Sequence, residues 1–316
     1  MEPNKALVCG SLAYDSILLF PDRFKTHIFP DKIHMLSVSF LVPEMRREFG
    51  GCAANIAYNL RLLGEIGLPM GTVGKDFAPY REWLMQCGVP TDYLKVIDSE
   101  FTAQAFITTD LDDNQITAFH PGAMQHSHLN QVTASIGATI GVLSPDGRQG
   151  MIDHAQQFAA SKMPFIFDPG QGLPMFDAAE LKTFIGRATW VAVNEYEWQM
   201  LHEKTGWSEQ DITARVEALI VTYGGDGSVI YTREARYEIP CARPRELVDP
   251  TGCGDAYRAG VVHGLLQKCD WPTIGRLGSL MGAIKIESRG PQNHRFARPE
   301  FERRYVENFG QGSHGT

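Results

Sequence analysis

The second half of the chain alternates between short apolar runs and longer segments with helical spacing. Apolar runs typical of buried strands occupy residues 138–145, 164–170, 189–195, 218–225 and 228–232. Residues 153–161, 177–188, 195–204 and 208–219 carry apolar side chains at helical intervals, which predicts helices. Four of the five strands end in a polar or glycine-rich loop, as parallel sheets do at their ligand-binding edge. The pattern therefore predicts an α/β domain with a mostly parallel central sheet.

Two stretches in the first half break this rhythm. Residues 16–48 are rich in Phe, Ile, Val and Ser with little helical period, and residues 101–120 form two β-rich arms around an Asp-Asp-Asn turn, which predicts a β-hairpin. We interpret both as insertions that form a small β-sheet lid, with ordinary edge strands as the alternative. The remaining α/β nucleotide-binding and catalytic domain would comprise residues 1–15, 49–100 and 121–316.

The composition excludes several classes of partner. The formal net charge of −8 argues against nucleic acids and anionic membranes, which favour a basic face. No apolar run approaches the roughly 20 residues of a membrane span, and the N-terminus does not resemble a signal peptide. The six cysteines are scattered without a C-x-x-C pair, which suits free thiols in a reducing compartment. These features predict a cytoplasmic protein that acts on small molecules.

The sequence DPTGCGD, at residues 249–255, combines a glycine-rich turn with a carboxylate where a helix is predicted to begin. Gly252 and Gly254 let the main chain approach a ligand closely, and successive N–H groups around Cys253 would form an anion-binding nest at the helix N-terminus. A bound phosphate would repel Asp255, unless Asp255 accepts a proton from a hydroxyl that attacks that phosphate. A simple helix cap is an equally good interpretation of Asp255 from this segment alone.

A second glycine pair precedes another predicted helix, which ends at Gly64. In EFGGCAANIAYNLRLLG, Gly50 and Gly51 stand just before Asn55. The glycines would let a ligand hydroxyl approach the main chain while Asn55 offers its amide. Alternatively, Asn55 caps the helix.

Five segments of the chain resemble motifs of the ribokinase-like (PfkB) family of carbohydrate and nucleoside kinases, and they occur in the family's order. The two motifs above are similar to its signature regions, and the similarity extends over nearly the whole chain. GSLAYD resembles the family's first strand, which ends in a substrate-binding Asp. VNEYE and VTYGGDG, which begin at Val193 and Val221, resemble its N-x-x-E and T-x-G-x-x-G motifs. The resemblance implies a three-layer α/β/α domain with a small β-sheet lid.

The resemblance also implies roles for individual residues. Asp255 would be the catalytic base, and the amides of Gly252, Cys253 and Gly254 would form an anion hole for the γ-phosphoryl group of ATP. The other implied sites are Asn194 and Glu197 for Mg²⁺, largely through water; Asn194, Thr222, Gly224 and Gly227 for the nucleotide; and Asp15, Gly51 and Asn55 for the acceptor. Main-chain oxygens near Asp249 and Thr251, with the loop at residues 287–296, could also bind K⁺.

The predicted lid hairpin bears on the acceptor. Gln104, Phe106 and Phe119 offer an amide and aromatic walls that suit a flat base, although at least one Phe could serve hairpin packing. With the segments at residues 168–171 and 290–294, this stretch looks like prokaryotic adenosine-type nucleoside kinases. The chain is thus predicted to be an ATP-dependent kinase for the 5′-hydroxyl of an adenosine-, inosine- or guanosine-type nucleoside, as a monomer or homodimer. A sugar kinase and a non-catalytic nucleoside sensor are the alternatives.

Overall fold

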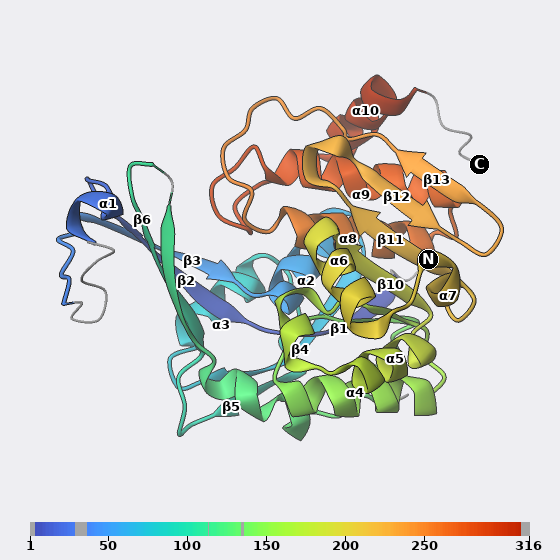
Figure 1. Cartoon of the computed structure of the whole chain (residues 1–316), viewed down its shortest axis with the longest axis horizontal. Helices are drawn as coiled ribbons and strands as arrows, with labels where there is room; N and C mark the ends of the chain where they lie inside the picture. Colours follow the sequence, from blue (N-terminus) through green and yellow to red (C-terminus); the bar gives the residue numbers. More distant parts are fainter. Residues whose placement is uncertain (1–3, 29–36, 113, 134–135, 311–316) are drawn as a thin grey trace.

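A nine-stranded sheet runs through the computed structural model, which describes residues 4–28, 37–112, 114–133 and 136–310 (Figure 1). Its strands are β1 (Lys5–Cys9), β4 (Ile66–Gly74), β5 (Leu94–Ile97), β8 (Ile140–Leu143), β9 (Phe165–Phe167), β10 (Trp190–Asn194), β11 (Ala218–Thr222), β12 (Ser228–Tyr231) and β13 (Arg236–Ile239). The order is β13-β12-β11-β10-β9-β8-β1-β4-β5. Neighbours from β5 to β11 are parallel, whereas β12 and β13 pair antiparallel, so the predicted mostly parallel sheet is confirmed.

Helices cover both faces of this sheet. In β1, Ala6 and Val8 point into one hydrophobic core, and Leu7 and Cys9 point into the other, as strand periodicity requires. The first core includes α2 (Cys52–Leu62), α3 (Ala78–Gln86), α8 (Cys253–Leu266) and α9 (Trp271–Lys285); the second includes α4 (Arg148–Ala160), α5 (Ala178–Arg187) and α6 (Glu195–Thr205). α10 (Arg298–Phe309) packs on α9. No helix in these described ranges is long and apolar enough to cross a membrane.

A second sheet of four strands projects from the α/β body (Figure 1). Its strands are β2 (Ala13–Leu19), β3 (Glu44–Gly50), β6 (Ala103–Thr109) and β7 (Gln115–His120), in the order β3-β2-β6-β7, with the short helix α1 (Phe24–His27) between β2 and β3. β6 and β7 pair antiparallel, which confirms the predicted hairpin. β2 begins before the predicted boundary at residue 16, and β3 continues beyond residue 48.

Two local predictions are wrong. The helix expected over residues 208–219 is only α7 (Glu209–Thr213), because Ala218 already pairs with Trp190 in the sheet and the apolar side chains that follow are fully buried. Asp15 does not end the first strand, since β1 stops at Cys9 and Asp15 lies within β2. Asp15 therefore belongs to the four-stranded lid sheet.

Candidate active site

The loop before α8 is held in a conformation that only glycine accepts readily. Gly252 is the N-cap of α8 with φ +82°, and a Cβ atom there would lie 2.6 Å from Cβ of Pro291. The carboxylate of Asp249 accepts hydrogen bonds from the main-chain N–H of Thr251 and of Gly290, each at 2.9 Å. These contacts fix where the first N–H groups of α8 point.

Those first N–H groups are the ones predicted to form an anion hole. The first turn of a helix has no internal acceptors for its N–H groups, although the N–H of Cys253 lies 3.1 Å from the carbonyl oxygen of Pro250. Gly254 is exposed, and a Cβ atom there would meet only Nη1 of Arg258, at 3.7 Å. The structure thus leaves room for an anionic group at Gly254.

Asp255 is the third residue of α8 rather than its cap, so the helix-cap interpretation is wrong. Its Oδ2 accepts a hydrogen bond from Nδ2 of Asn55 at 2.8 Å, across 200 positions of sequence. Burial raises the pKa of Asp255 to about 7, and the bond from Asn55 opposes this shift. A carboxylate whose pKa lies near neutrality is well suited to accept a proton from a hydroxyl group.

Asn55 does not cap its helix either. Gly51 is the N-cap of α2, with φ +93° and no room for a Cβ atom beside Leu12 and Ser11, so Asn55 lies inside the helix. Its Oδ1 accepts a hydrogen bond from Nε2 of Gln292 at 2.8 Å. Because one end of the amide is fixed by Gln292, the other end presents its N–H group to Asp255.

A buried ion cluster lies beside Asp255. Nε and Nη2 of Arg258 donate to Oδ1 of Asp168 at 3.2 and 3.0 Å, and Nη2 lies 3.8 Å from Oε2 of Glu197. Burial disfavours the charged guanidinium, but Asp168 and Glu197 outweigh it and raise the pKa of Arg258. Two carboxylates therefore contact one guanidinium, and the nearby Asp255 also helps to raise its pKa, so negative charge is in excess here, which suits a divalent cation.

The N-x-x-E segment combines a cap with this cluster. Asn194 ends β10 and caps α6, where its Oδ1 accepts from the N–H of Glu197 and its N–H donates to Oε2 of Glu197, both at 2.8 Å. Glu197 is nevertheless not a solvated residue, because its side chain is only 13% exposed and burial raises its pKa. No group of three or more His, Cys, Asp or Glu side chains in the described ranges could hold a metal by itself. These residues fit Mg²⁺ held mainly through water and nucleotide phosphates.

The residues predicted for the nucleotide gather at the same edge of the sheet. Thr222 ends β11 directly beside Asn194 in the strand register. Gly224 has φ +57°, and a Cβ atom there would meet nothing within 4 Å, so its main chain is open to a ligand. At Gly227, φ is +94° and a Cβ atom would lie 2.2 Å from the carbonyl oxygen of Ile239, so the fold itself requires glycine at this position.

The lid sheet separates residues that were predicted to act together. Residues opposite one another in a register share a face, and successive residues alternate. Asp15 is paired with Ala105, which is paired with Phe119, whereas Phe106 is paired with Ser16. Asp15 and Phe119 thus share one face, and Phe106 lies on the other.

Gln104 shares the face of Phe106, where its Nε2 donates to Oδ2 of Asp76 at 3.2 Å. On the opposite face, Arg46 of β3 reaches to 3.7 Å from Oδ2 of Asp249, so this face is turned toward the start of α8. Asp15 lies on that face, and burial raises its pKa to about 6, with Glu48 and Asp249 adding to the shift. Asp15, rather than Gln104 or Phe106, therefore lies near the loop before α8, and Phe119 shares its face of the lid sheet.

Sequence reasoning assigned no role to several residues of this site, although it noted the segments at residues 168–171 and 290–294 for their resemblance to nucleoside kinases. Asp168 follows β9 at the carboxyl edge of the sheet, and Arg258 stands three residues after Asp255 on the same helix. The place of each residue in the sequence could therefore have indicated that it belongs to the site. Gln292 lies in the segment at residues 290–294 that resembles nucleoside kinases, but nothing in that segment showed that it would contact Asn55, 237 residues away.

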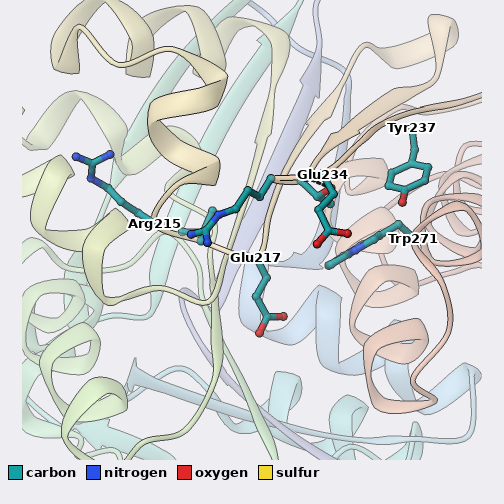
Figure 2. A pocket seen from close by; sticks show the side chains of 8 residues that line it. Arg215, Glu217, Glu234, Tyr237 and Trp271 are labelled. Atoms are coloured by element: carbon teal, nitrogen blue, oxygen red, sulfur yellow. Dashed lines mark hydrogen bonds between the residues drawn. The ribbon is translucent and has the colours of Figure 1, made fainter.

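A separate cavity of about 550 Å³ lies away from this site (Figure 2). Arg215 and Glu217 precede β11, Glu234 lies in the turn between β12 and β13, and Tyr237 and Trp271 complete the wall. The cavity is therefore at the amino end of β11, the opposite edge of the sheet from Thr222. None of the residues described above at the start of α8, in the ion cluster or on the lid sheet lines it.

The family model described as pfkB family carbohydrate kinase matches residues 14–296. The chain belongs to the pfkB family. A nucleoside kinase of Methanocaldococcus jannaschii is 31% identical over 294 residues, covering 92% of this chain and 93% of that protein. The structure of Burkholderia thailandensis nucleoside kinase in complex with inosine is 49% identical with a TM-score of 0.89, covering 97% of this chain and 98% of the other.

A second structure of the Burkholderia enzyme, in complex with ADP-inosine, is 50% identical with a TM-score of 0.86 and covers 97% of this chain and 96% of the other. The predicted pfkB membership, the ribokinase-like α/β fold with its lid sheet, and the class of enzyme are confirmed. The chain is a nucleoside kinase, a phosphotransferase with an alcohol group as acceptor.

Proposed function

We propose that this kinase transfers the γ-phosphoryl group of ATP to the 5′-hydroxyl of a purine ribonucleoside, with Asp255 as the base. The observation that carries the proposal is the position of Asp255. Its carboxylate, with a pKa raised to about 7, is oriented by Asn55 and stands in the first turn of α8, beside the open main chain of Gly254. A hydroxyl bound there would face a proton acceptor and an anion-binding helix N-terminus at once.

The donor would bind along the edge formed by Asn194, Thr222 and Gly224. The Burkholderia enzyme's complex with ADP-inosine supports an adenine nucleotide as the donor. Bound Mg²⁺ would neutralise charge on the transferring phosphate groups. Glu197 and Asn194 would hold its water ligands, while Arg258 keeps Asp168 and Glu197 in place.

The acceptor would lie between the start of α8 and the lid face that carries Asp15. Asp15 would accept hydrogen bonds from the ribose hydroxyls, and Phe119 would contact the base. The inosine complex of the Burkholderia enzyme supports a purine nucleoside as the acceptor. Closure of the lid over the nucleoside would exclude water and limit wasteful hydrolysis of ATP.

An ADP-release assay with product mass analysis tests this proposal. Adenosine, inosine, guanosine, cytidine and uridine would be compared with ribose and fructose in the presence of Mg-ATP. We expect 5′-phosphorylated purine nucleosides. Turnover of sugars alone would show a sugar kinase, and nucleoside binding without turnover would show a sensor; either result would refute the proposal.

The variant Asp255→Asn separates chemistry from binding. We expect kcat to fall by several orders of magnitude, on the scale of about 10³ or more for the loss of a base, while the Kd of inosine changes little. Asp211→Asn is the matched control, because Asp211 is also the third residue of its helix but lies in α7. Near-normal turnover of the Asp255 variant would exclude its role as the base.

A further inference from the structure

Lys285, the last residue of α9, is completely buried. Its Nζ donates hydrogen bonds to the main-chain oxygens of Asp249 at 2.7 Å and Ser288 at 2.9 Å. Burying an ammonium group costs several kcal/mol unless polar groups replace its water. Here carbonyl oxygens replace that water, and burial still lowers the pKa of Lys285 while the neighbouring Asp249 acts in the opposite direction. Because burial of this charge costs stability, its presence indicates that Lys285 positions other groups.

The two carbonyl oxygens belong to loops that meet at the catalytic turn. Asp249 stands three residues before Gly252, and Ser288 stands three residues after Lys285. The same two loops are also joined through Ile286, whose carbonyl oxygen accepts from the N–H of Val248 at 2.9 Å and of Asp249 at 3.0 Å. The ammonium group therefore closes a clamp that sets the direction from which the chain enters α8.

This is the region where the family resemblance implies a K⁺ site. Main-chain oxygens near Asp249 and Thr251, together with the loop at residues 287–296, would supply its ligands. In the structure, two of these oxygens, on Asp249 and Ser288, already bind Lys285. A second monovalent cation on the same oxygens would face a like charge at close range. The residues present therefore do not fit K⁺ at this place.

We propose that the ammonium group of Lys285 takes the place of a bound monovalent cation, holding the loop before α8 and making the kinase independent of K⁺. This inference rests on the proposed phosphoryl transfer at Asp255. Lys285 is a positioning residue: it acts through the carbonyl oxygens of Asp249 and Ser288 on the N–H groups of the anion hole. Its charge is also fixed close to the site at which the phosphoryl group would bind.

The first test compares wild-type turnover in Na⁺, K⁺ and tetramethylammonium chloride at one ionic strength. We expect the same kcat and KM in all three. Lys285→Ala should lose at least about tenfold in kcat in tetramethylammonium chloride, because the oxyanion donors are no longer held in place. K⁺, NH₄⁺ or methylammonium should restore a large part of that loss. A wild-type enzyme that K⁺ activates, or a variant that no cation restores, would overturn the proposal.

Lys204→Ala is the matched control. Lys204 also donates to main-chain oxygens, of Pro174 at 3.2 Å and Phe176 at 2.8 Å, but in a different part of the fold. Its variant should show no response to cations, and a response equal to that of Lys285→Ala would overturn the proposal.

The melting temperature of the ligand-free proteins gives a readout that does not depend on kinase activity. K⁺ should raise the melting temperature of Lys285→Ala relative to tetramethylammonium and leave that of the wild type unchanged. This result would support the clamp even if the proposed phosphoryl transfer failed. If Lys285→Ala does not fold, the wild-type comparison alone decides, because activation by K⁺ contradicts the proposal and indifference supports it.

Discussion

Replacing Asp255 by Asn should stabilise the folded protein while it abolishes catalysis. Burial raises the pKa of Asp255 from an ordinary value of 3.8 to about 7. At about 1.4 kcal/mol for each pKa unit, ionising the folded carboxyl costs up to about 4 kcal/mol above pH 7. Asn removes this charge at nearly constant volume. Its amide N–H has no hydrogen-bond acceptor prepared for it in the wild-type site, and this offsets part of the gain in stability. We expect a net gain of about 1–2 kcal/mol at pH 8.

The sign of the pH dependence follows from the direction of the shift. Because the folded pKa is raised, the wild-type carboxyl contributes stability below about pH 4, where it is protonated in both states. That contribution is lost as the pH rises from 4 to 7, since the unfolded chain releases its proton first. The variant lacks this loss, so its advantage should be absent near pH 4 and complete by pH 8.

Urea unfolding followed by tryptophan fluorescence at several pH values measures this difference. Asp211→Asn serves as the control of opposite sign, because hydrogen bonds from Ser208 lower the pKa of Asp211 at the same helix position. Its variant should be no more stable than the wild type at pH 8. If Asp255→Asn is less stable than the wild type at pH 8, or equally stabilised at every pH, the desolvation argument is refuted.

Three further substitutions test the remaining contacts of the site. Asn55→Ala removes the donor to Asp255, so the acid limb of the kcat/KM profile should move to higher pH and the acceptor KM should rise; an unchanged profile would contradict the contact. Arg258→Met leaves the carboxylate of Asp168 buried without its partner and should cost about 3–5 kcal/mol in urea unfolding, whereas a negligible change would show that the cluster is not coupled. Gly252→Ala forces a side chain into positive φ and should lower kcat at least about tenfold by displacing the anion hole, with inosine affinity measured by calorimetry largely retained; full activity would exclude the proposed loop geometry.

The strands and helices of the α/β body were predictable because their patterns are local. Continuous apolar runs such as that of β10 mark strands buried on both faces, and α6 begins at a cap and ends before a glycine. The wrong prediction of a helix over residues 208–219 also came from a local pattern. The residues after Thr213 suit a helix by their spacing, but the chain must already be extended at Ala218 to pair with β10. Tertiary pairing overrode a weak local preference.

The lid illustrates a different limit. Composition and the turn signal predicted the β6–β7 hairpin, but they left open which side chains share a face. Register decides this, since a shift of one residue exchanges the two faces of a strand. The pairing of Asp15 with Ala105, and of Ala105 with Phe119, placed Phe106 on the face opposite Asp15.

The sequence by itself determined the family, the α/β body, the lid hairpin and the glycine-rich turn with Asp255, because each depends on residue types at short spacing. The tertiary structure alone decided what surrounds Asp255. Asn55 and Gln292 come from distant segments, and their hydrogen bonds leave no local pattern. The carbonyl oxygens that bind Lys285 leave even less, since every residue has a main-chain oxygen and only folding brings two of them to one ammonium group.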